Sequence, residues 1–354
     1  MNILEEYGWN TFHQQNYQKL NSSGFEAARV ISIKGFRYLL ITSQGELDAE
    51  LSGKLLYGTE PEALPKTGDW VLFVRYETMG YITDLLPRHN ELYRKSPGTK
   101  TEKQVLAANI DFALIVQGLD RDFNLMRLDR YMVQITACNI TPVVILNKAD
   151  LVDDTAPFID QIAKLGRDCK VFMCSTYTGQ GITEMINDLF EKNKTYILVG
   201  SSGVGKSSLM NALTDSTFRE TGNISHSTGK GRHITTTRDL FRLPNGSLII
   251  DTPGMREFGV VFDEESGSGS LFPLIEQYAV NCRYADCSHL EEGGCAVLEA
   301  YHNGTLDPHV YESYLKLTRE QKHFQIKAED KKRLGKQFGK MVREARDYRK
   351  KNKY

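Results

Sequence analysis

A glycine-rich segment in the middle of the chain has the spacing of a phosphate-binding loop. Residues 200–207 match the pattern G-x-x-x-x-G-K-[ST] and stand between an apolar run at 196–199 and a helix-forming stretch at 208–213. Glycines let backbone N–H groups approach phosphates, the lysine reaches the β- and γ-phosphate oxygens, and the hydroxyl after it binds Mg²⁺. The predicted phosphate site consists of Gly200, Ser201, Ser202, Gly203, Val204, Gly205, Lys206, Ser207 and Ser208.

A second motif, Asn147-Lys148-Ala149-Asp150, follows the apolar run 143–146 and is typical of guanine recognition. Guanine presents two donors, the ring N1–H and the exocyclic amine, and the Asp150 carboxylate can accept from both. Adenine does not present this pair of donors. The alternative, in which Asp150 only caps a helix, leaves Asn147 and Lys148 unexplained. The sequence therefore predicts GTP and GDP as ligands.

Two shorter motifs are expected beside the same ligand. Asp251 begins Asp251-Thr-Pro-Gly254 after the apolar run 247–250, so it is predicted to lie at the carboxyl end of a strand, near Mg²⁺ and the γ-phosphate. Ser175 follows the run 171–173 in the same way, and a backbone N–H of its loop would face the guanine oxygen. A Ser-Thr turn is also expected there on capping grounds alone.

Three cysteines and a histidine form a cluster near the C-terminal end. Cys282, Cys287, His289 and Cys295 lie within fourteen residues. Three thiolates and one imidazole are the ligands that a tetrahedral structural Zn²⁺ takes, with no position left open for catalysis. We predict one structural Zn²⁺ here. The alternative is a set of reduced cysteines packed as small hydrophobic side chains beside a chance histidine.

The elements that must position these motifs form three predicted domains. Residues 1–98 contain short strand-like runs with turn signals between them, which favour a closed barrel of the OB type and leave an SH3-like barrel open. Residues 104–265 alternate strand and helix patterns, which indicate an α/β domain with a parallel sheet. Residues 271–354 are predicted to be a zinc-binding helical domain. Linkers are expected at 97–99 and at the Ser-Gly run 263–270. The barrel strands are predicted at 29–33, 38–42, 47–51, 70–74 and 81–86.

The nucleotide motifs occur in an unusual order. The guanine motif precedes the phosphate-binding loop, whereas Ras-like chains have the opposite order. A circular permutation of the GTPase domain explains this, because permutation keeps the packed sheet and only moves the chain ends. The segment after Asp251 consequently leads directly into the C-terminal domain.

Charge is distributed unevenly over the 354 residues. The chain has a net charge of −1, yet residues 316–353 hold fifteen Lys or Arg against five Asp or Glu. This basic end predicts an RNA partner, with a solvated helix face as the alternative. No apolar run approaches the roughly 20 residues that span a bilayer, and residues 1–10 lack a signal-peptide pattern. We expect a cytoplasmic monomer without membrane contact.

Taken together, these features resemble the RsgA/YjeQ family of circularly permuted, ribosome-associated GTPases over nearly the whole chain. The resemblance is carried by the permuted nucleotide motifs, Gly68-Asp69-Trp70-Val71 in the barrel, Gly231-Arg-His233 with the threonines after it, and the Cys/His cluster. It implies binding to the small ribosomal subunit and its 16S rRNA, GTP hydrolysis stimulated by that subunit, and a role late in 30S maturation.

Two positions bear on catalysis. Ile234 stands where the family has the first threonine, so Thr235 and Thr236 are both candidates to bind Mg²⁺ and the γ-phosphate; the alternative is a solvated loop. Met255 occupies the position of the water-orienting glutamine of Ras-like enzymes, and a thioether cannot orient water. Slow intrinsic hydrolysis is expected, and either His233 or a group from the partner must complete the site beside Lys206. A histidine without a role is the alternative for His233.

Two other functions remain open at this point. A GTP-dependent metal chaperone would pass metal on through the cysteines, and it predicts labile, exposed ligands. An RNA-binding scaffold with an inactive nucleotide site is the other alternative, because Met255 replaces the glutamine.

Overall fold

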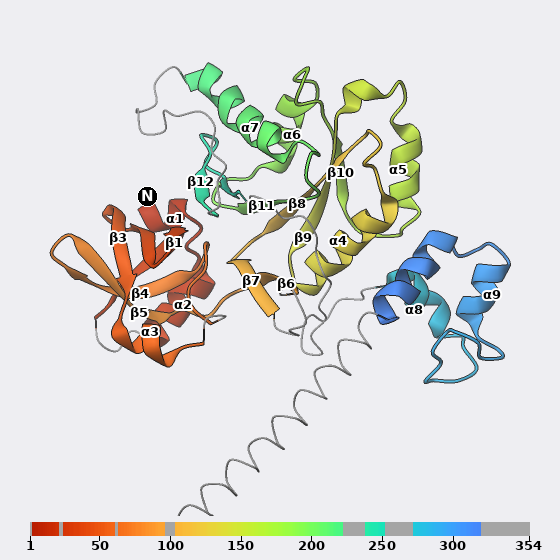
Figure 1. The fold of residues 1–354 in the computed structure, drawn as a ribbon, viewed down its shortest axis with the longest axis horizontal. Helices are drawn as coiled ribbons and strands as arrows, with labels where there is room; N and C mark the ends of the chain where they lie inside the picture. Colours follow the sequence, from red (N-terminus) through yellow and green to blue (C-terminus); the bar gives the residue numbers. More distant parts are fainter. Residues whose placement is uncertain are drawn as a thin grey trace, which may run out of the picture.

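The structure, a computed structural model, describes residues 2–20, 24–60, 63–95, 103–221, 238–251 and 272–319. These residues form an N-terminal barrel, a six-stranded sheet covered by helices, and a C-terminal helical module (Figure 1). Among the described helices, none has both the length and the apolar character that crossing a lipid bilayer requires.

The barrel closes in the order β1-β2-β3-β5-β4, with β3 parallel to β5 and the other pairs antiparallel. Alternate side chains point inward, so that Val30, Leu40, Phe73 and Ile82 are fully buried in its core. This closed five-stranded barrel agrees with the predicted OB type. Its elements are β1 (Glu26–Lys34), β2 (Arg37–Thr42), β3 (Gly45–Leu51), α3 (Gly53–Gly58), β4 (Trp70–Tyr76) and β5 (Met79–Leu85).

Two short helices precede the barrel, and the sequence did not predict them. α1 (Ile3–Glu6) and α2 (Thr11–Leu20) help to cover an apolar patch that includes Trp70 and Leu72. α1 is only four residues long, and α2 has a polar composition with a weak helical periodicity. Their burial depends on contact with the barrel, which local sequence patterns do not reveal.

The central sheet has the order β10-β9-β8-β11-β13-β12 and is parallel except for β12. Its inner strands are buried on both faces, which explains why they appear as continuous apolar runs in the sequence. The strands are β8 (Phe112–Gly118), β9 (Thr141–Asn147), β10 (Lys170–Met173), β11 (Thr195–Val199), β12 (Leu240–Arg242) and β13 (Leu248–Ile250).

Helices cover both faces of this sheet. α4 (Leu125–Ala137) and α5 (Ala156–Ala163) belong to one apolar cluster through residues such as Met132 and Ile162, whereas α6 (Ile182–Leu189) and α7 (Lys206–Thr221) belong to the other (Figure 1). A 3₁₀ turn, η1 (Ala149–Leu151), follows β9. The predicted α/β GTPase domain with a parallel sheet is thereby confirmed.

A small hairpin joins the barrel to the sheet. β6 (Glu91–Lys95) pairs antiparallel with β7 (Lys103–Ala108), on either side of the predicted linker at 97–99. The linker itself lies outside the described residues. The chain therefore reaches the GTPase domain through a paired hairpin. The predicted end of the barrel domain at 98 falls between its two strands, whereas the predicted start of the GTPase domain at 104 lies within β7.

The C-terminal module packs against the α4 side of the GTPase domain. It contains α8 (Pro273–Ala279), α9 (Ala296–His302) and helical residues 308–319. Leu317 packs on Val133 of α4, and Gly166 (φ +62°) approaches α8 so closely that a Cβ there would lie 2.6 Å from Leu274 Cδ1. The Ser-Gly run 263–270 and the basic segment beyond residue 319 lie outside the described residues.

Candidate nucleotide and metal sites

The predicted nucleotide motifs meet at the carboxyl edge of the parallel sheet. Ile197 of β11 pairs with Ile250 of β13, so the phosphate-binding loop and Asp251 leave neighbouring strands. β8 lies between β9 and β11 and separates the guanine motif from the phosphate-binding loop by one strand. Ligands of open α/β sheets bind at this edge.

Three glycines shape the phosphate-binding loop by their positive φ angles. Gly200 has φ +143°, and a Cβ there would lie 2.4 Å from the Val116 carbonyl oxygen. Gly205 has φ +96°, and a Cβ there would lie 2.2 Å from Asn147 Nδ2. Gly203 has φ +87° with open space around it. Gly200 and Gly205 are therefore required by close packing as well as by backbone conformation.

Asn147 connects three loops of the site. Its side chain is fully buried, and Nδ2 donates to the Val204 carbonyl oxygen at 2.9 Å. Its Oδ1 accepts from the Thr176 backbone N–H at 3.1 Å. The asparagine of the guanine motif thus ties the phosphate-binding loop to the loop after β10.

Lys148 is held by an acid that the sequence analysis did not identify. Its backbone is left-handed (φ +63°), and its Nζ lies 2.5 Å from Asp120 Oδ2 in the loop after β8. The hydrogen bond from Lys148 lowers the pKa of Asp120. Gly118 allows this approach, since a Cβ there would lie 2.9 Å from Asp120 Oδ1. No sequence motif marks Asp120, because its partner is 28 residues away.

Asp150 and Ser175 contact each other through their side chains. The Ser175 hydroxyl donates to Asp150 Oδ1, which orients the carboxylate. The backbone N–H of Ser175 donates to the Gln180 carbonyl oxygen at 2.9 Å, and that of Thr176 donates to Asn147. Both N–H groups are used inside the protein, and the Ser175 hydroxyl, besides its bond to Asp150, accepts from the Thr178 backbone N–H at 3.1 Å.

Lys206 lies over its own loop. Its Nζ donates to the carbonyl oxygens of Gly200 at 2.8 Å and Ser201 at 2.5 Å. Burial lowers the pKa of Lys206, and the nearby Asp251 and Asp122 carboxylates act in the opposite direction. The ammonium therefore lies where the phosphate oxygens of a bound nucleotide would compete with these two carbonyl oxygens for its hydrogen bonds. The side chains of Ser202, Ser207 and Ser208 are exposed around it.

Several predicted residues cannot be placed. Gly231, His233, Thr235, Thr236, Gly254 and Met255 all lie outside the described residues.

The Cys/His cluster has the dimensions of a tetrahedral zinc site. Cys282 Sγ lies 3.8 Å from Cys295 Sγ, and His289 Nδ1 lies 3.6 Å from Cys282 Sγ and 3.4 Å from Cys295 Sγ. Bonds of about 2.3 Å to sulfur and 2.0 Å to nitrogen give tetrahedron edges of roughly 3.8 and 3.6 Å. With Cys287 included, all four ligand atoms lie within 4.8 Å of one another. The four residues fit a metal ion.

The loops around this cluster are fixed by further hydrogen bonds. The His289 carbonyl oxygen accepts from the Tyr311 hydroxyl at 2.7 Å, and Cys295 caps the start of α9. The Glu292 carboxylate accepts from the Ser288 hydroxyl and backbone N–H, and these bonds lower the pKa of Glu292 to about 2. Protein side chains supply all four ligand positions, as a structural metal site requires.

A buried ion pair of the GTPase domain lies at its junction with the metal-binding module. Asp129 of α4 lies 2.7 Å from Arg167 Nε, and its other oxygen accepts from the Ser313 hydroxyl. The two ionic side chains are only 2% and 9% exposed. Arg167 also covers the ring of Phe272 at 5.0 Å. Sequence patterns gave no sign of this junction, because Asp129 and Ser313 are 184 residues apart.

Comparisons with known proteins agree with this architecture. The sequence model of the family described as RsgA GTPase matches residues 85–261. The chain is 42% identical over 348 residues to small ribosomal subunit biogenesis GTPase RsgA 1 of Bacteroides thetaiotaomicron, covering 98% of this chain and 97% of that one. It is 39% identical to the RsgA of Syntrophotalea carbinolica, over 89% and 88% of the two chains.

Solved structures show the same fold. The crystal structure of YjeQ from Thermotoga maritima superposes with a TM-score of 0.61 at 26% identity, over 83% of this chain and 98% of that one. The crystal structure of YloQ, a circularly permuted GTPase, gives the same TM-score and identity over 86% and 97%. The reversed order of the nucleotide motifs agrees with the circular permutation of that neighbour. This chain is a GTP-hydrolysing member of the RsgA GTPase family.

Proposed function

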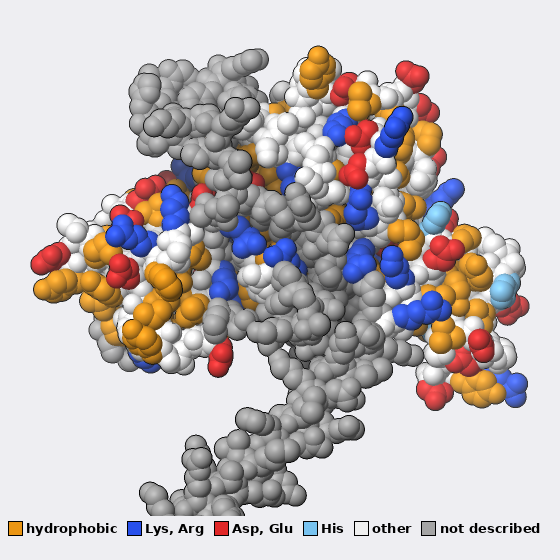
Figure 2. Space-filling view, in the orientation of Figure 1, with side chains coloured by type: hydrophobic (Ala, Val, Ile, Leu, Met, Phe, Trp, Pro, Cys, Tyr) orange, Lys and Arg blue, Asp and Glu red, His pale blue; other side chains and the backbone are white. Residues whose placement is uncertain are grey.

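We propose that this protein binds the small ribosomal subunit and hydrolyses GTP there as a switch in late subunit maturation, with hydrolysis stimulated by the subunit. The observation that carries the proposal is the similarity, over 98% of the chain, to a protein named for small ribosomal subunit biogenesis. Basic side chains on the face between the barrel and the C-terminal module support an rRNA contact (Figure 2). A ribosomal partner also suits the monomeric, cytoplasmic protein predicted from the sequence.

Guanine recognition is assigned to Asp150, with Asn147 and Lys148 supporting it. The Asp150 carboxylate would accept from guanine N1–H and the exocyclic amine, and the Ser175 hydroxyl restricts its rotation. Asp120 would hold Lys148 in place beside the base. Adenine lacks this pair of donors, so adenine nucleotides would leave the carboxylate unsatisfied.

Phosphate binding is assigned to the loop 200–208. When a nucleotide binds, its phosphate oxygens would replace the carbonyl oxygens of Gly200 and Ser201 as acceptors for Lys206 Nζ. The ammonium would then contact the β- and γ-phosphates. Ser207 and Asp251, with Thr235 or Thr236, are our candidates to hold Mg²⁺, which would neutralise phosphate charge. Gly254 would face the γ-phosphate.

Water activation is the incomplete part of the site. Met255 offers no hydrogen-bonding group suited to orienting water, so His233 or a group of the bound subunit would do so. If the subunit supplies that group, the enzyme alone would turn over slowly, which would account for stimulation by the partner.

We expect small subunits to raise GTP turnover by at least about tenfold, since groups supplied in trans to other GTPases have larger effects. Phosphate release is to be measured with purified small subunits, with large subunits as the control. Equal turnover in both arms would reject the ribosome-coupled switch. ATP hydrolysis as fast as GTP hydrolysis would instead reject the role of Asp150, and absence of any hydrolysis would favour the scaffold.

Zinc is the metal that the Cys/His cluster is proposed to hold as a structural ion. Purified protein is expected to contain about one zinc per chain, and Cys287→Ser is expected to lower that content at least about tenfold, because a thiolate ligand is lost. Cys169→Ser, outside the cluster, should keep the metal. Elemental analysis and limited proteolysis measure content and folding. Zinc lost from the wild-type protein to a mild chelator would favour the metal chaperone instead.

A further inference from the structure

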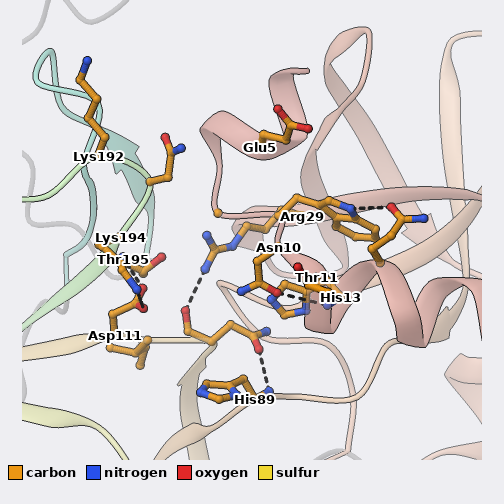
Figure 3. A pocket seen from close by; sticks show the side chains of 16 residues that line it. Glu5, Asn10, Thr11, His13, Arg29, His89, Asp111, Lys192, Lys194 and Thr195 are labelled. Atoms are coloured by element: carbon orange, nitrogen blue, oxygen red, sulfur yellow. Dashed lines mark hydrogen bonds and ion pairs between the residues drawn. The ribbon is translucent and has the colours of Figure 1, made fainter. Parts of the chain in front are cut away.

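A second cleft lies between the barrel and the GTPase domain, away from the nucleotide motifs. It has a volume of about 590 Å³ and is lined by α2, the barrel and the start of β11 (Figure 3). Lys194 and Thr195 line it at the amino end of β11, whereas the phosphate-binding loop follows the carboxyl end of the same strand. Its size suits a nucleotide unit better than a single ion.

The floor of this cleft carries a buried positive charge. The Arg29 guanidinium is 1% exposed and donates to the backbone carbonyl oxygens of Gly68, Tyr7 and Asn109. Within the described part of the chain, it forms no ion pair. A guanidinium has five N–H donors, so one N–H on each terminal nitrogen remains. Burial lowers the pKa of Arg29, the Asp111 and Asp69 carboxylates act in the opposite direction without a direct ion pair, and an anion in the cleft would add a direct charged contact.

The rim of the cleft adds further features that suit an anion. The first turn of the ten-residue helix α2 lines it, with Asn10 Oδ1 accepting from the His13 backbone N–H at 3.2 Å. A helix N-terminus favours negative charge. Lys192 and Lys194 lie on the opposite wall, where the Lys192 side chain extends away from Arg29 and His13 (Figure 3). Asp111, an acid that lines the same cleft, already accepts from Lys194 Nζ at 2.9 Å.

His13 provides an independent sign of a missing ligand. Its side chain lines the cleft and is 3% exposed, yet its Nδ1 has no hydrogen-bond partner among the described residues. Burial lowers the pKa of His13 to about 3, and the neighbouring Arg29 and His89 act in the same direction. Glu5 and Asp111 are the acids that line the same cleft. Buried polar atoms normally have a partner, so this nitrogen points to an acceptor or donor that binds there.

We propose that this cleft binds the phosphate of a nucleotide unit, supplied either by a free mononucleotide or by an RNA strand. Arg29 and the α2 N-terminus would contact the phosphate, His13 would donate to it, and the exposed Lys192 side chain would turn inward to reach it. The rings of Trp9 and His89 line the same cleft and offer surfaces for a base to stack on. Because the walls come from both the barrel and the GTPase domain, the ligand would bridge the two.

Histidine ring NMR of the full chain tests this proposal, with the GTP site saturated by GDP and Mg²⁺ so that only the second site is free. The probes are inorganic phosphate, adenosine monophosphate and a short single-stranded RNA, and His13→Gln assigns the His13 signal. Binding is expected to shift that signal and raise the His13 pKa, because an adjacent anion stabilises the imidazolium. Lys192→Gln should weaken binding by about fivefold. Lys19→Gln, an exposed lysine elsewhere on α2, should not.

The three probes distinguish the possible sources of the phosphate. Saturation by adenosine monophosphate assigns the site to a free nucleotide, and saturation by RNA alone assigns it to a strand. The proposal is overturned if neither moves the His13 signal, or if inorganic phosphate alone does so, which means an adventitious ion only. Equal weakening by Lys192→Gln and Lys19→Gln also overturns it. GTP turnover is not the readout, so failure here leaves the proposed GTPase function untouched.

Discussion

Replacing Gly205 by alanine is expected to weaken GDP and GTP binding by about 100-fold. The added Cβ would lie 2.2 Å from Asn147 Nδ2, which must then leave its place. Asn147 would lose its hydrogen bonds to Val204 and Thr176, worth about 1 kcal/mol each, and left-handed backbone strain adds about 1 kcal/mol. Together these changes correspond to about two orders of magnitude in affinity. Titration with a fluorescent GDP analogue measures the loss.

Gly203→Ala is the matched control for this substitution. Gly203 lies in the same loop at φ +87°, but a Cβ there meets nothing within 4 Å. Both variants carry the backbone strain, and only Gly205→Ala carries the clash, so the ratio of their affinities isolates the contribution of Asn147. We expect Gly203→Ala to weaken binding by about tenfold at most. Equal losses in the two variants would show that Asn147 does not couple the guanine motif to the phosphate-binding loop.

The nucleotide motifs were predictable because their chemistry depends on residues that are close in sequence. A buried parallel strand gives a continuous apolar run, and the functional loop follows at its carboxyl end, as at 143–146 before Asn147. The four zinc-ligand candidates were also local, within fourteen residues. The barrel strands were found to within a few residues for the same reason, since each is bounded by turn signals.

The missed features all depend on contacts between distant segments. In the sequence Asp120 does not differ from the other acids, and only the fold brings Lys148 into contact with it. The apolar pattern of α2 is too weak to be recognised without the barrel beside it. The hairpin of β6 and β7 was missed because its connection contains Pro97-Gly98, which is equally typical of a linker. Local patterns carry no information about such pairings.

Replacing Asp129 by asparagine is expected to lower the free energy of local unfolding at the junction of α4 and the C-terminal module by about 3 kcal/mol. The change removes the Asp129 charge from the Arg167 guanidinium, which is only 9% exposed, and removal of one partner of a buried pair is strongly destabilising. The Ser313 hydroxyl also loses its charged acceptor. Hydrogen exchange on peptides covering 125–137 and 308–319 measures the local free energy, which a whole-chain melting curve would average over several domains.

Lys54→Ala provides the control, because it removes an ion pair that is exposed to solvent. Lys54 and Asp84 are 3.4 Å apart, but their side chains are 77% and 46% exposed, so its loss should cost less than about 1 kcal/mol. Arg167→Met combined with Asp129→Asn should restore part of the stability, because no unpaired charge then stays buried. If Asp129→Asn changes exchange no more than Lys54→Ala does, the Asp129 carboxylate, with its bonds to Arg167 and Ser313, does not hold the two domains together. If it accelerates exchange in 308–319 as well as in α4, the GTPase domain and the metal-binding module open as one unit.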